Sequence, residues 1–326
     1  MGYTRKAWTL AVAAGVLMMS TASPAFAADC KVGISIKQLN APYFAELMES
    51  AKKAAKAKGC KVLTADAQGK VMKQIADIED MLSRDIDLLI MDPAGPDGLV
   101  QVTREAAQNG VKTVVLDSSI NEAAKYVTVV QSNNKKNGEL VGQWIVDKMG
   151  GKPLRIALIS GAKGNPVGRV RRESVLSGIA KAQKQKYGEK NYTIVGHGWG
   201  NWTQQGGLNA MEDILTASKN INLLVSENDS MALGARRAIK AQGLTDQITI
   251  AAAADGQKQA LKLIKEGKYG VTGLNAPDLI ANTGVDIGIK AINGKLPEDF
   301  PKITYTPPVA ITKSNVDKYY NPNSAF

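Results

Sequence analysis

Polar, charged and aromatic side chains gather where the apolar, strand-like segments of this sequence end. In open parallel sheets, ligands bind outside the carboxyl ends of the strands. The segments that follow strands here supply carboxylates, amides, an arginine, a lysine and aromatic rings, and they lie at residues 37–44, 117–119, 161–165, 196–202, 227–229, 255–256 and 275–278. We therefore expect these segments to assemble a ligand site.

The residue types in these segments suit a polyhydroxylated solute. Sugar hydroxyls both donate and accept, so they pair with acceptor carboxylates, donor guanidinium groups and bifunctional amides. The C–H faces of a sugar ring pack on flat aromatic side chains. The sequence therefore predicts a hydrogen-bonding carbohydrate pocket rather than a reaction centre.

Catalytic patterns are weak by comparison. The chain has one histidine, His197, in a glycine-rich segment, and it contains no serine elbow, histidine cluster or Cys-x-x-Cys. The glycines of residues 161–168 lack both the Gly-x-Gly-x-x-Gly fingerprint and a Gly-Lys-Ser/Thr ending. We expect a binding protein with no catalytic residues, metal or cofactor, and a hydrolase is the enzymatic alternative.

Some of the candidate residues also have a structural interpretation. Asp117 and Asn228 follow strands and precede helices, where Asp and Asn commonly cap the helix N-terminus. Packing alone is the alternative role for Trp202. At least one arginine among residues 169–172 is expected to be solvated, because this segment begins a helix.

The first residues have the pattern of an export signal. Basic residues 5–6 precede the apolar stretch 7–19, and Ala25-Phe26-Ala27 completes a cleavage pattern. The apolar stretch is shorter than the roughly 20 residues of a membrane-spanning helix. We predict a signal peptide over residues 1–27, a mature chain that begins at Ala28, and a periplasmic location.

The chain is strongly basic, with a formal net charge of +11 at pH 7. We interpret this charge as a solvated, lysine-rich surface, exemplified by the helical segment with Lys52, Lys53, Lys56 and Lys58. An anionic solute is the alternative explanation. An exported protein does not meet DNA, so we expect no nucleic-acid partner.

The sequence contains two cysteines, Cys30 and Cys60, each at the start of a strand-like segment. One helical segment separates them, as in a β-α-β unit. Adjacent parallel strands begin at the same end of a sheet, so both sulfurs fall there. In an exported chain this predicts a Cys30–Cys60 disulfide, with two buried free thiols as the alternative.

Apolar strand-like runs alternate with amphipathic helical runs along nearly the whole chain after residue 27. The strand-like runs are 32–36, 62–65, 88–91, 113–116, 127–130, 155–159, 192–195, 223–225, 248–251 and 271–274. Such alternation is typical of an α/β fold whose helices cover both faces of parallel sheets. These runs are too many for one compact sheet, and the polar segment 131–134 divides them. We predict two doubly wound parallel-sheet lobes, followed by a polar tail, residues 319–326, that frays.

Several motifs match a known family in their order and spacing. The most specific is Glu-Asn-Asp-Ser-Met-Ala-Leu-Gly-Ala at residues 227–235, and the supporting ones are Asn40-Ala41-Pro42-Tyr43-Phe44, Leu116-Asp117, Gly207-Leu208-Asn209-Ala210-Met211, Ala254-Asp255-Gly256 and Asn275-Ala276-Pro277-Asp278. With these motifs the chain after the signal resembles the periplasmic pentose- and hexose-binding proteins of the ribose-binding type, which have the type I periplasmic binding fold. The first motif is similar to that family's Asn-Asp-x-Met-Ala-Leu-Gly-Ala segment.

The resemblance implies one ligand site between the two lobes. Its predicted residues are Lys37, Asn40, Tyr43, Phe44, Asp117, Arg169, Trp202, Asn228, Asp255 and Asn275. By this resemblance Asp117, Asn228 and Asp255 hydrogen-bond sugar hydroxyls, Arg169 reaches the ligand from the second lobe, and Trp202 stacks on the sugar. The tyrosine and phenylalanine form the opposing aromatic wall.

Three positions depart from the ribose type or are similar to other relatives. Ala41 stands where the ribose type has a ligand-binding asparagine, and Ser118 stands where it has an arginine. Lys37 is similar to the lysine that arabinose-binding relatives place after the first strand. These differences disfavour ribose and leave another pentose or hexose, a polyol or an acidic sugar derivative as candidates.

The family's topology and role imply the remaining expectations. The chain would cross between the lobes near residues 131–134, 252–256 and 274–278. The first lobe would comprise residues 28–132 and 276–304, and the second 133–275 and 305–326. A monomer would close around its solute and deliver it to an inner-membrane ABC permease that a cytoplasmic ATPase drives. Signalling to a chemoreceptor or sensor kinase is the alternative output.

Overall fold

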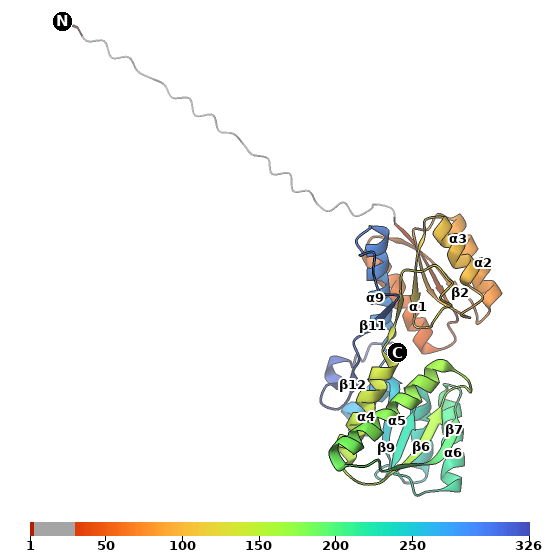
Figure 1. Cartoon of the computed structure of the whole chain (residues 1–326), viewed down its shortest axis with the longest axis vertical. Helices are drawn as coiled ribbons and strands as arrows, with labels where there is room; N and C mark the ends of the chain where they lie inside the picture. Colours follow the sequence, from red (N-terminus) through yellow and green to blue (C-terminus); the bar gives the residue numbers. More distant parts are fainter. Residues whose placement is uncertain (3–29) are drawn as a thin grey trace.

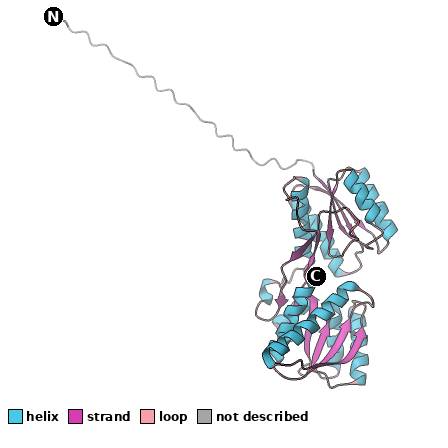
Figure 2. Ribbon diagram, in the orientation of Figure 1, coloured by secondary structure: helices cyan, strands magenta, loops and turns pink. Residues whose placement is uncertain are grey.

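The computed structural model describes residues 1–2 and 30–326. These residues form two α/β lobes, one above the other in Figures 1 and 2, and each has a central sheet flanked by helices. The predicted signal peptide and its cleavage point lie outside the described residues, except for the first two positions. Within the described part, no helix is long and apolar enough to cross a membrane.

The sheet of the first lobe has the strand order β11-β5-β4-β3-β1-β2, and all its strand pairs are parallel. Its strands are β1 (Lys31–Ile36), β2 (Lys61–Asp66), β3 (Leu88–Asp92), β4 (Lys112–Leu116), β5 (Val129–Ser132) and β11 (Ile303–Thr306). Its helices are α1 (Pro42–Ala57), α2 (Val71–Ser83), α3 (Val100–Gln108) and α9 (Pro277–Ile292).

Each face of this sheet has its own apolar core. Along β3, Leu88 and Ile90 join the core that includes α1 and α9, whereas Leu89 and Met91 join the core that includes α2 and α3. Successive side chains of a strand point to opposite faces, so a strand covered on both faces must be apolar throughout. This requirement explains the uninterrupted apolar runs in the sequence.

The second lobe repeats the arrangement with the order β12-β10-β9-β8-β6-β7, in which the β10–β12 pair is antiparallel. Its strands are β6 (Leu154–Ser160), β7 (Tyr192–Trp199), β8 (Leu223–Ser226), β9 (Thr249–Asp255), β10 (Val271–Leu274) and β12 (Ala310–Ile311). Its helices are α4 (Asn134–Met149), α5 (Pro166–Tyr187), α6 (Gln204–Ala217), α7 (Asp229–Ala241), α8 (Lys258–Lys265) and the short η1 (Val316–Lys318). The prediction of two parallel-sheet lobes is confirmed.

Within residues 30–326 the chain crosses between the lobes three times: from β5 to α4, from β10 to α9, and from β11 to β12. The predicted crossing at residues 252–256 is wrong, because β9 pairs with β8 and β10 inside the second sheet. The third crossing lies instead at residues 307–309. Since β11 belongs to the first sheet, the returning segment of the first lobe reaches Thr306, beyond the expected boundary at 304.

One buried amide ties the crossings together. The Asn137 side chain donates through Nδ2 to the carbonyl of Leu274 at 2.6 Å and accepts at Oδ1 from the Val309 amide at 2.9 Å. The hydroxyls of Ser132 and Thr306 meet at 3.4 Å on neighbouring crossings. The connecting segments therefore form one hydrogen-bonded hinge rather than independent linkers.

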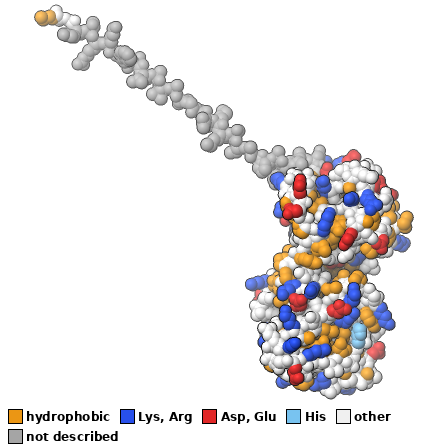
Figure 3. All heavy atoms as spheres, in the orientation of Figure 1, with side chains coloured by type: hydrophobic (Ala, Val, Ile, Leu, Met, Phe, Trp, Pro, Cys, Tyr) orange, Lys and Arg blue, Asp and Glu red, His pale blue; other side chains and the backbone are white. Residues whose placement is uncertain are grey.

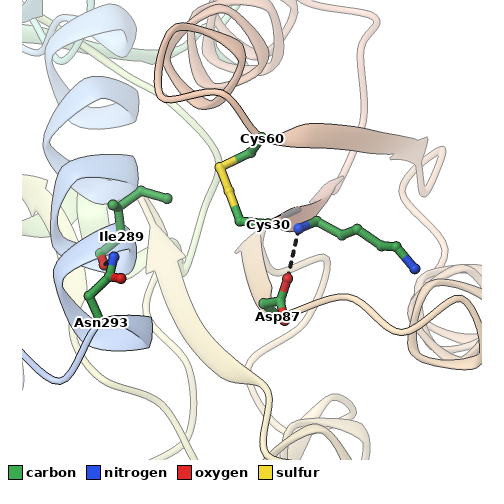
Figure 4. The surroundings of a disulfide bond; sticks show 6 residues. Cys30, Cys60, Asp87, Ile289 and Asn293 are labelled. Carbon is green, nitrogen blue, oxygen red and sulfur yellow. Dashed lines mark hydrogen bonds between the residues drawn. A yellow bond between two sulfur atoms is a disulfide. The ribbon is translucent and has the colours of Figure 1, made fainter. Parts of the chain in front are cut away.

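The predicted Cys30–Cys60 disulfide is confirmed, with the two Cα atoms 4.7 Å apart. The cysteines precede β1 and β2, which pair in parallel from Lys31 and Lys61 onward. Figure 4 shows the bond beside α9. The dashed line in that figure ends at Asp87, whose Oδ2 accepts from the Lys31 amide at 2.7 Å. The disulfide therefore lies at the amino ends of the strands, opposite to the end where a ligand would bind.

The expectation that residues 319–326 fray is wrong. Tyr319 and Tyr320 pack against the core of the second lobe, and Phe326 is only 8% exposed. The tail is polar in composition, but its apolar side chains stand at its two ends and both ends are packed.

The surface agrees with the interpretation of the net charge. On the face drawn in Figure 3, Lys and Arg side chains are interspersed with Asp and Glu over both lobes. Several form exposed ion pairs, such as Lys58 with Asp286 at 2.7 Å. Exposed pairs of this kind contribute little to stability and keep the surface hydrated.

Candidate functional site

In the first lobe, charged side chains meet at the carboxyl ends of β1, β3 and β4, which are neighbours in parallel register. Lys37 follows β1, Asp92 ends β3 and Asp117 follows β4. The Lys37 ammonium lies 3.4 Å from Asp92 Oδ2 and 4.0 Å from Asp117 Oδ2. It also donates to Ser118 Oγ at 2.8 Å and lies 4.4 Å from the centre of the Phe44 ring.

In the second lobe, a buried ion pair stands at the end of β9. Arg171 on α5 donates through Nη1 to Asp255 Oδ1 at 3.1 Å, and both side chains are less than one-tenth exposed. The same guanidinium donates to the carbonyl of Glu227 and, through Nε, to Asn134 Oδ1 at 2.8 Å. Asn275 Nδ2 donates to Asp255 Oδ1 at 3.2 Å. These contacts fix one carboxylate in a nearly dry setting.

Tyr43 connects the polar groups of the first lobe with those of the second. Its hydroxyl donates to Asp117 Oδ1 at 2.7 Å and lies 3.3 Å from Asn275 Oδ1. Burial, reinforced by the neighbouring carboxylate, raises the pKa of Tyr43 well above its ordinary value, so the phenol keeps its proton and remains a donor. A chain of polar contacts therefore runs from Asp117 through Tyr43 and Asn275 to Asp255 and Arg171.

Asp229 supports the loop that presents Asp255. Its Oδ2 accepts from the backbone amides of residues 255, 256 and 257 at 3.2, 2.8 and 2.9 Å, and its Oδ1 accepts from the Tyr269 hydroxyl at 2.7 Å. Burial raises the pKa of Asp229 to about 6, although these donors oppose the shift. Asp229 is thus a buried acceptor whose hydrogen bonds fix the path of the chain at the end of β9.

Trp202 packs into a recess made by two glycines. A Cβ on Gly161 would lie 2.2 Å from the indole, and a Cβ on Gly168 would lie 3.0 Å from it. The guanidinium carbon of Arg171 is 5.9 Å from the ring centre. The half-buried indole of Trp202 therefore packs against the two glycines and also lies beside the Arg171–Asp255 ion pair.

Three of the predicted site residues either cap a helix or are exposed. Asn228 caps α7, since its Oδ1 accepts from the Met231 amide at 2.9 Å, and its Nδ2 donates to the Trp202 carbonyl at 3.3 Å. The capping interpretation is thus confirmed for this residue. Asn40 and Arg169 are exposed. The predicted residues that lie together with the two ion pairs are Lys37, Tyr43, Phe44, Asp117, Trp202, Asp255 and Asn275.

Sequence reasoning missed Asp92 and Arg171, although both carried a signal. Asp92 ends β3 and obeys the same strand-end rule that selected the other residues. On α5 the buried positions include 168, 171, 175 and 178, which follow the helical period, so Arg171 is on the inner face and Arg169 is not.

A second polar cluster lies at the start of α5. Glu227 accepts from the Gly161 amide at 2.8 Å and from Arg172 Nη1 at 2.5 Å. Ser160 Oγ meets His197 Nε2 at 2.9 Å and Arg172 Nη1 at 3.1 Å. Because Ser160 is fully buried, this pair supports the loop rather than presenting a nucleophile. Among the described residues, no group of three or more His, Cys, Asp or Glu side chains is placed to hold a metal ion.

Asp92 is the most unfavourably placed carboxylate of the site. It is fully buried, and within the described residues neither of its oxygens accepts a hydrogen bond. Burial raises the pKa of Asp92 from 3.8 to about 7, with Lys37 opposing the shift and Asp117 adding to it. Since the unfolded chain releases this proton near its ordinary pKa, ionised Asp92 destabilises the fold increasingly as the pH rises from about 4 to 7.

Asp92→Asn is therefore expected to raise the free energy of unfolding at pH 8.5 by about 2 kcal/mol. A pKa shift of this size would by itself correspond to about twice that gain. The substitution also removes a partner of Lys37, and this loss offsets about half of the gain. The gain should vanish at about pH 3, below the ordinary pKa of 3.8, where both states hold the proton. Urea unfolding at several pH values measures it, with Asp66→Asn, at the less buried end of β2, as the matched control. A difference that does not vary with pH would contradict the assignment.

Comparison with known proteins places the chain in a family. Residues 32–296 match the family described as periplasmic binding protein domain. The chain is 33% identical over 264 residues to the ribose import binding protein of Bacillus subtilis (strain 168). The matched region covers 81% of this chain and 82% of that protein.

Two solved structures share the architecture. An ABC transporter periplasmic solute binding protein from Actinobacillus succinogenes 130z with bound D-allose has a TM-score of 0.77 and 25% identity, covering 89% of this chain and 100% of that one. An ABC transporter solute binding protein from Mycobacterium smegmatis with bound glycerol has a TM-score of 0.76 and 29% identity, covering 91% and 98%. With its two hinged lobes and its strand-end site, this chain belongs to the periplasmic binding protein family.

Proposed function

We propose that this protein is the solute-binding component of an ABC importer and that it captures a neutral monosaccharide or polyol between its lobes. The observation that carries the proposal is the chain of polar contacts from Asp117 to Asp255, which joins donors and acceptors of both lobes through Tyr43 and Asn275. The relatives named for ribose import and the solved structures with bound D-allose and glycerol support this solute class.

The charges at the site favour a neutral solute over an acidic one. Lys37 already faces Asp92 and Asp117, and Arg171 already pairs with Asp255. Carboxylates therefore outnumber the cations, and an acidic sugar would bring a further negative charge into a buried setting without a free partner. Neutral hydroxyls can instead donate to carboxylate oxygens in charge-assisted hydrogen bonds, which are about twice as strong as neutral ones.

The proposed mechanism is closure of the hinge. A solute whose hydroxyls contact Asp117 on one lobe and Asp255 on the other binds the closed arrangement better than the open one. That difference in affinity shifts the population towards the closed state. The hydrogen bonds of Asn137 keep the crossings in register while the lobes move. The closed protein would then deliver its solute to a membrane permease.

The location follows from the same proposal. Residues 5–27 have the composition of a cleaved export signal. The Cys30–Cys60 disulfide is of the kind that persists in an oxidising compartment. We therefore assign the mature protein, beginning at Ala28, to the periplasm.

A thermal-shift panel tests the proposal. The mature protein would be screened against pentoses, hexoses, polyols, inositols and sugar acids. One or a few neutral compounds should raise the melting temperature, with a concentration dependence that follows RT ln(1 + [L]/Kd). Asp117→Ala, which removes the acceptor on the first lobe, should abolish the shift. Stabilisation by sugar acids alone, or turnover of the stabilising compound, would contradict the proposal.

A further inference from the structure

Residues 319–326, which we call the strap, extend from the second lobe to the first. Figure 1 marks the end of the described chain between the two lobes. Tyr319 and Tyr320 pack against the second-lobe core, and the Lys258 ammonium of α8 donates to the carbonyl of Ser324. The strap then places Phe326 against Tyr43, in the first turn of α1.

Phe326 and Phe44 both contact the ring of Tyr43. Both contacts are edge-to-face, with ring centres 5.4 Å apart for Phe326 and 5.2 Å apart for Phe44, and interplanar angles of 84°. This is the geometry that the quadrupoles of aromatic rings favour. With Phe326 only 8% exposed, the contact is a packed one between the lobes.

The position of the Tyr43 ring decides where its hydroxyl lies. That hydroxyl donates to Asp117 and approaches Asn275, so it connects the polar groups of the two lobes. A ring free to tilt would lose the 2.7 Å contact with Asp117 and would present a different surface to a solute. We propose that Phe326 is a positioning residue for solute binding, which fixes Tyr43 between Asp117 and Asn275 and holds the lobes together. The inference rests on the proposed function for its solute.

A cavity of about 310 Å³ lies between the strap, α8 and α9, and its lining includes Glu46 of the first lobe. Four strap residues also line it: Tyr319, Asn321, Ser324 and Phe326. The strap therefore lacks continuous packing on the side that faces this cavity. The aromatic contact at Phe326 is what extends its attachment to the first lobe, so removal of this one ring should release the link.

The test is a double-mutant cycle on the mature protein with the most stabilising neutral compound of the panel. Phe326→Ala should weaken affinity by about 10-fold, chiefly through faster dissociation. In a Tyr43→Phe background, which keeps the ring and removes the hydroxyl, the same change should weaken affinity by less than about 2-fold. Phe326→Tyr should bind as the unaltered protein does, and the exposed neighbour Ala325→Ser is the matched control.

A second measurement separates this inference from the proposed function. Hydrogen–deuterium exchange of residues 42–48 in the ligand-free protein should accelerate in Phe326→Ala and stay unchanged in Ala325→Ser. If no compound binds the unaltered protein, the proposed function fails, while the exchange result still supports or overturns the contact. Unchanged exchange, unchanged affinity, or an equal loss in both backgrounds would overturn the positioning role.

Discussion

Arg171→Ala is expected to weaken solute binding by about 100-fold or more. The guanidinium is the buried partner of Asp255, and its loss leaves that carboxylate without a counter-charge in a dry setting. Burial already raises the pKa of Asp255, and Arg171 is the strongest influence that opposes the rise. Without Arg171 the carboxyl takes up a proton more readily and no longer serves as a full acceptor for a solute hydroxyl.

Isothermal titration calorimetry with the stabilising compound measures this effect. Arg169→Ala is the matched control, because it removes the same side chain from an exposed position two residues away on α5. The control should bind within about 2-fold of the unaltered protein. Breaking a buried pair also costs about 3–5 kcal/mol of stability, so the titration belongs at a temperature where circular dichroism shows both variants folded. Equal losses in the two variants would contradict the assignment of Arg171.

Removal of the disulfide should affect stability and leave affinity intact. The bond joins residues 30 positions apart, and constraining a loop of that length stabilises the folded state by about 3–4 kcal/mol. Cys30 and Cys60 stand at the amino ends of β1 and β2, whereas Lys37 follows the carboxyl end of β1. The doubly substituted variant Cys30→Ala/Cys60→Ala should therefore unfold at lower urea concentration and still bind the solute.

Urea unfolding followed by circular dichroism provides the measurement. Adding a reductant to the unaltered protein should reproduce the loss, and adding it to the doubly substituted variant should change nothing. Mass spectrometry of the non-reduced protein should show no free thiol. A loss below about 1 kcal/mol, or a large loss of affinity, would show that the bond does not have the role argued here.

Much of the fold could be predicted because buried parallel strands have a strong signal. Strands such as β3 are apolar at every position, since both faces are covered. β11 and β12 gave no such signal: β11 is an edge strand with exposed Ile303 and Tyr305, and β12 has two residues. Because these two strands were not predicted, the return to the second lobe was expected after residue 304, whereas the structure places it at residues 307–309.

The place of the site along the sheets could be predicted better than the side chains that form it. The strand-end rule selected Asp117, Asp255 and Asn275, which the structure connects through Tyr43. It gives a place along the sheet but not the direction of a side chain on the following helix. Arg169 was predicted from the family resemblance, whereas Arg171 is the arginine that the fold buries beside Asp255. The contact between Phe326 and Tyr43 depends on the path of the whole strap. The polar composition of the strap gave no sign of this contact in the sequence.

Small-angle X-ray scattering of the mature protein, with and without a saturating neutral solute, tests the central claim most directly. A solute held between Asp117 and Asp255 must bring the two lobes together, so the radius of gyration should fall when it is added. The fall should be absent in Asp117→Ala, which removes the acceptor on the first lobe. A solute that binds at one site per chain, as calorimetry would show, and yet leaves the radius of gyration unchanged would contradict capture by closure of the hinge.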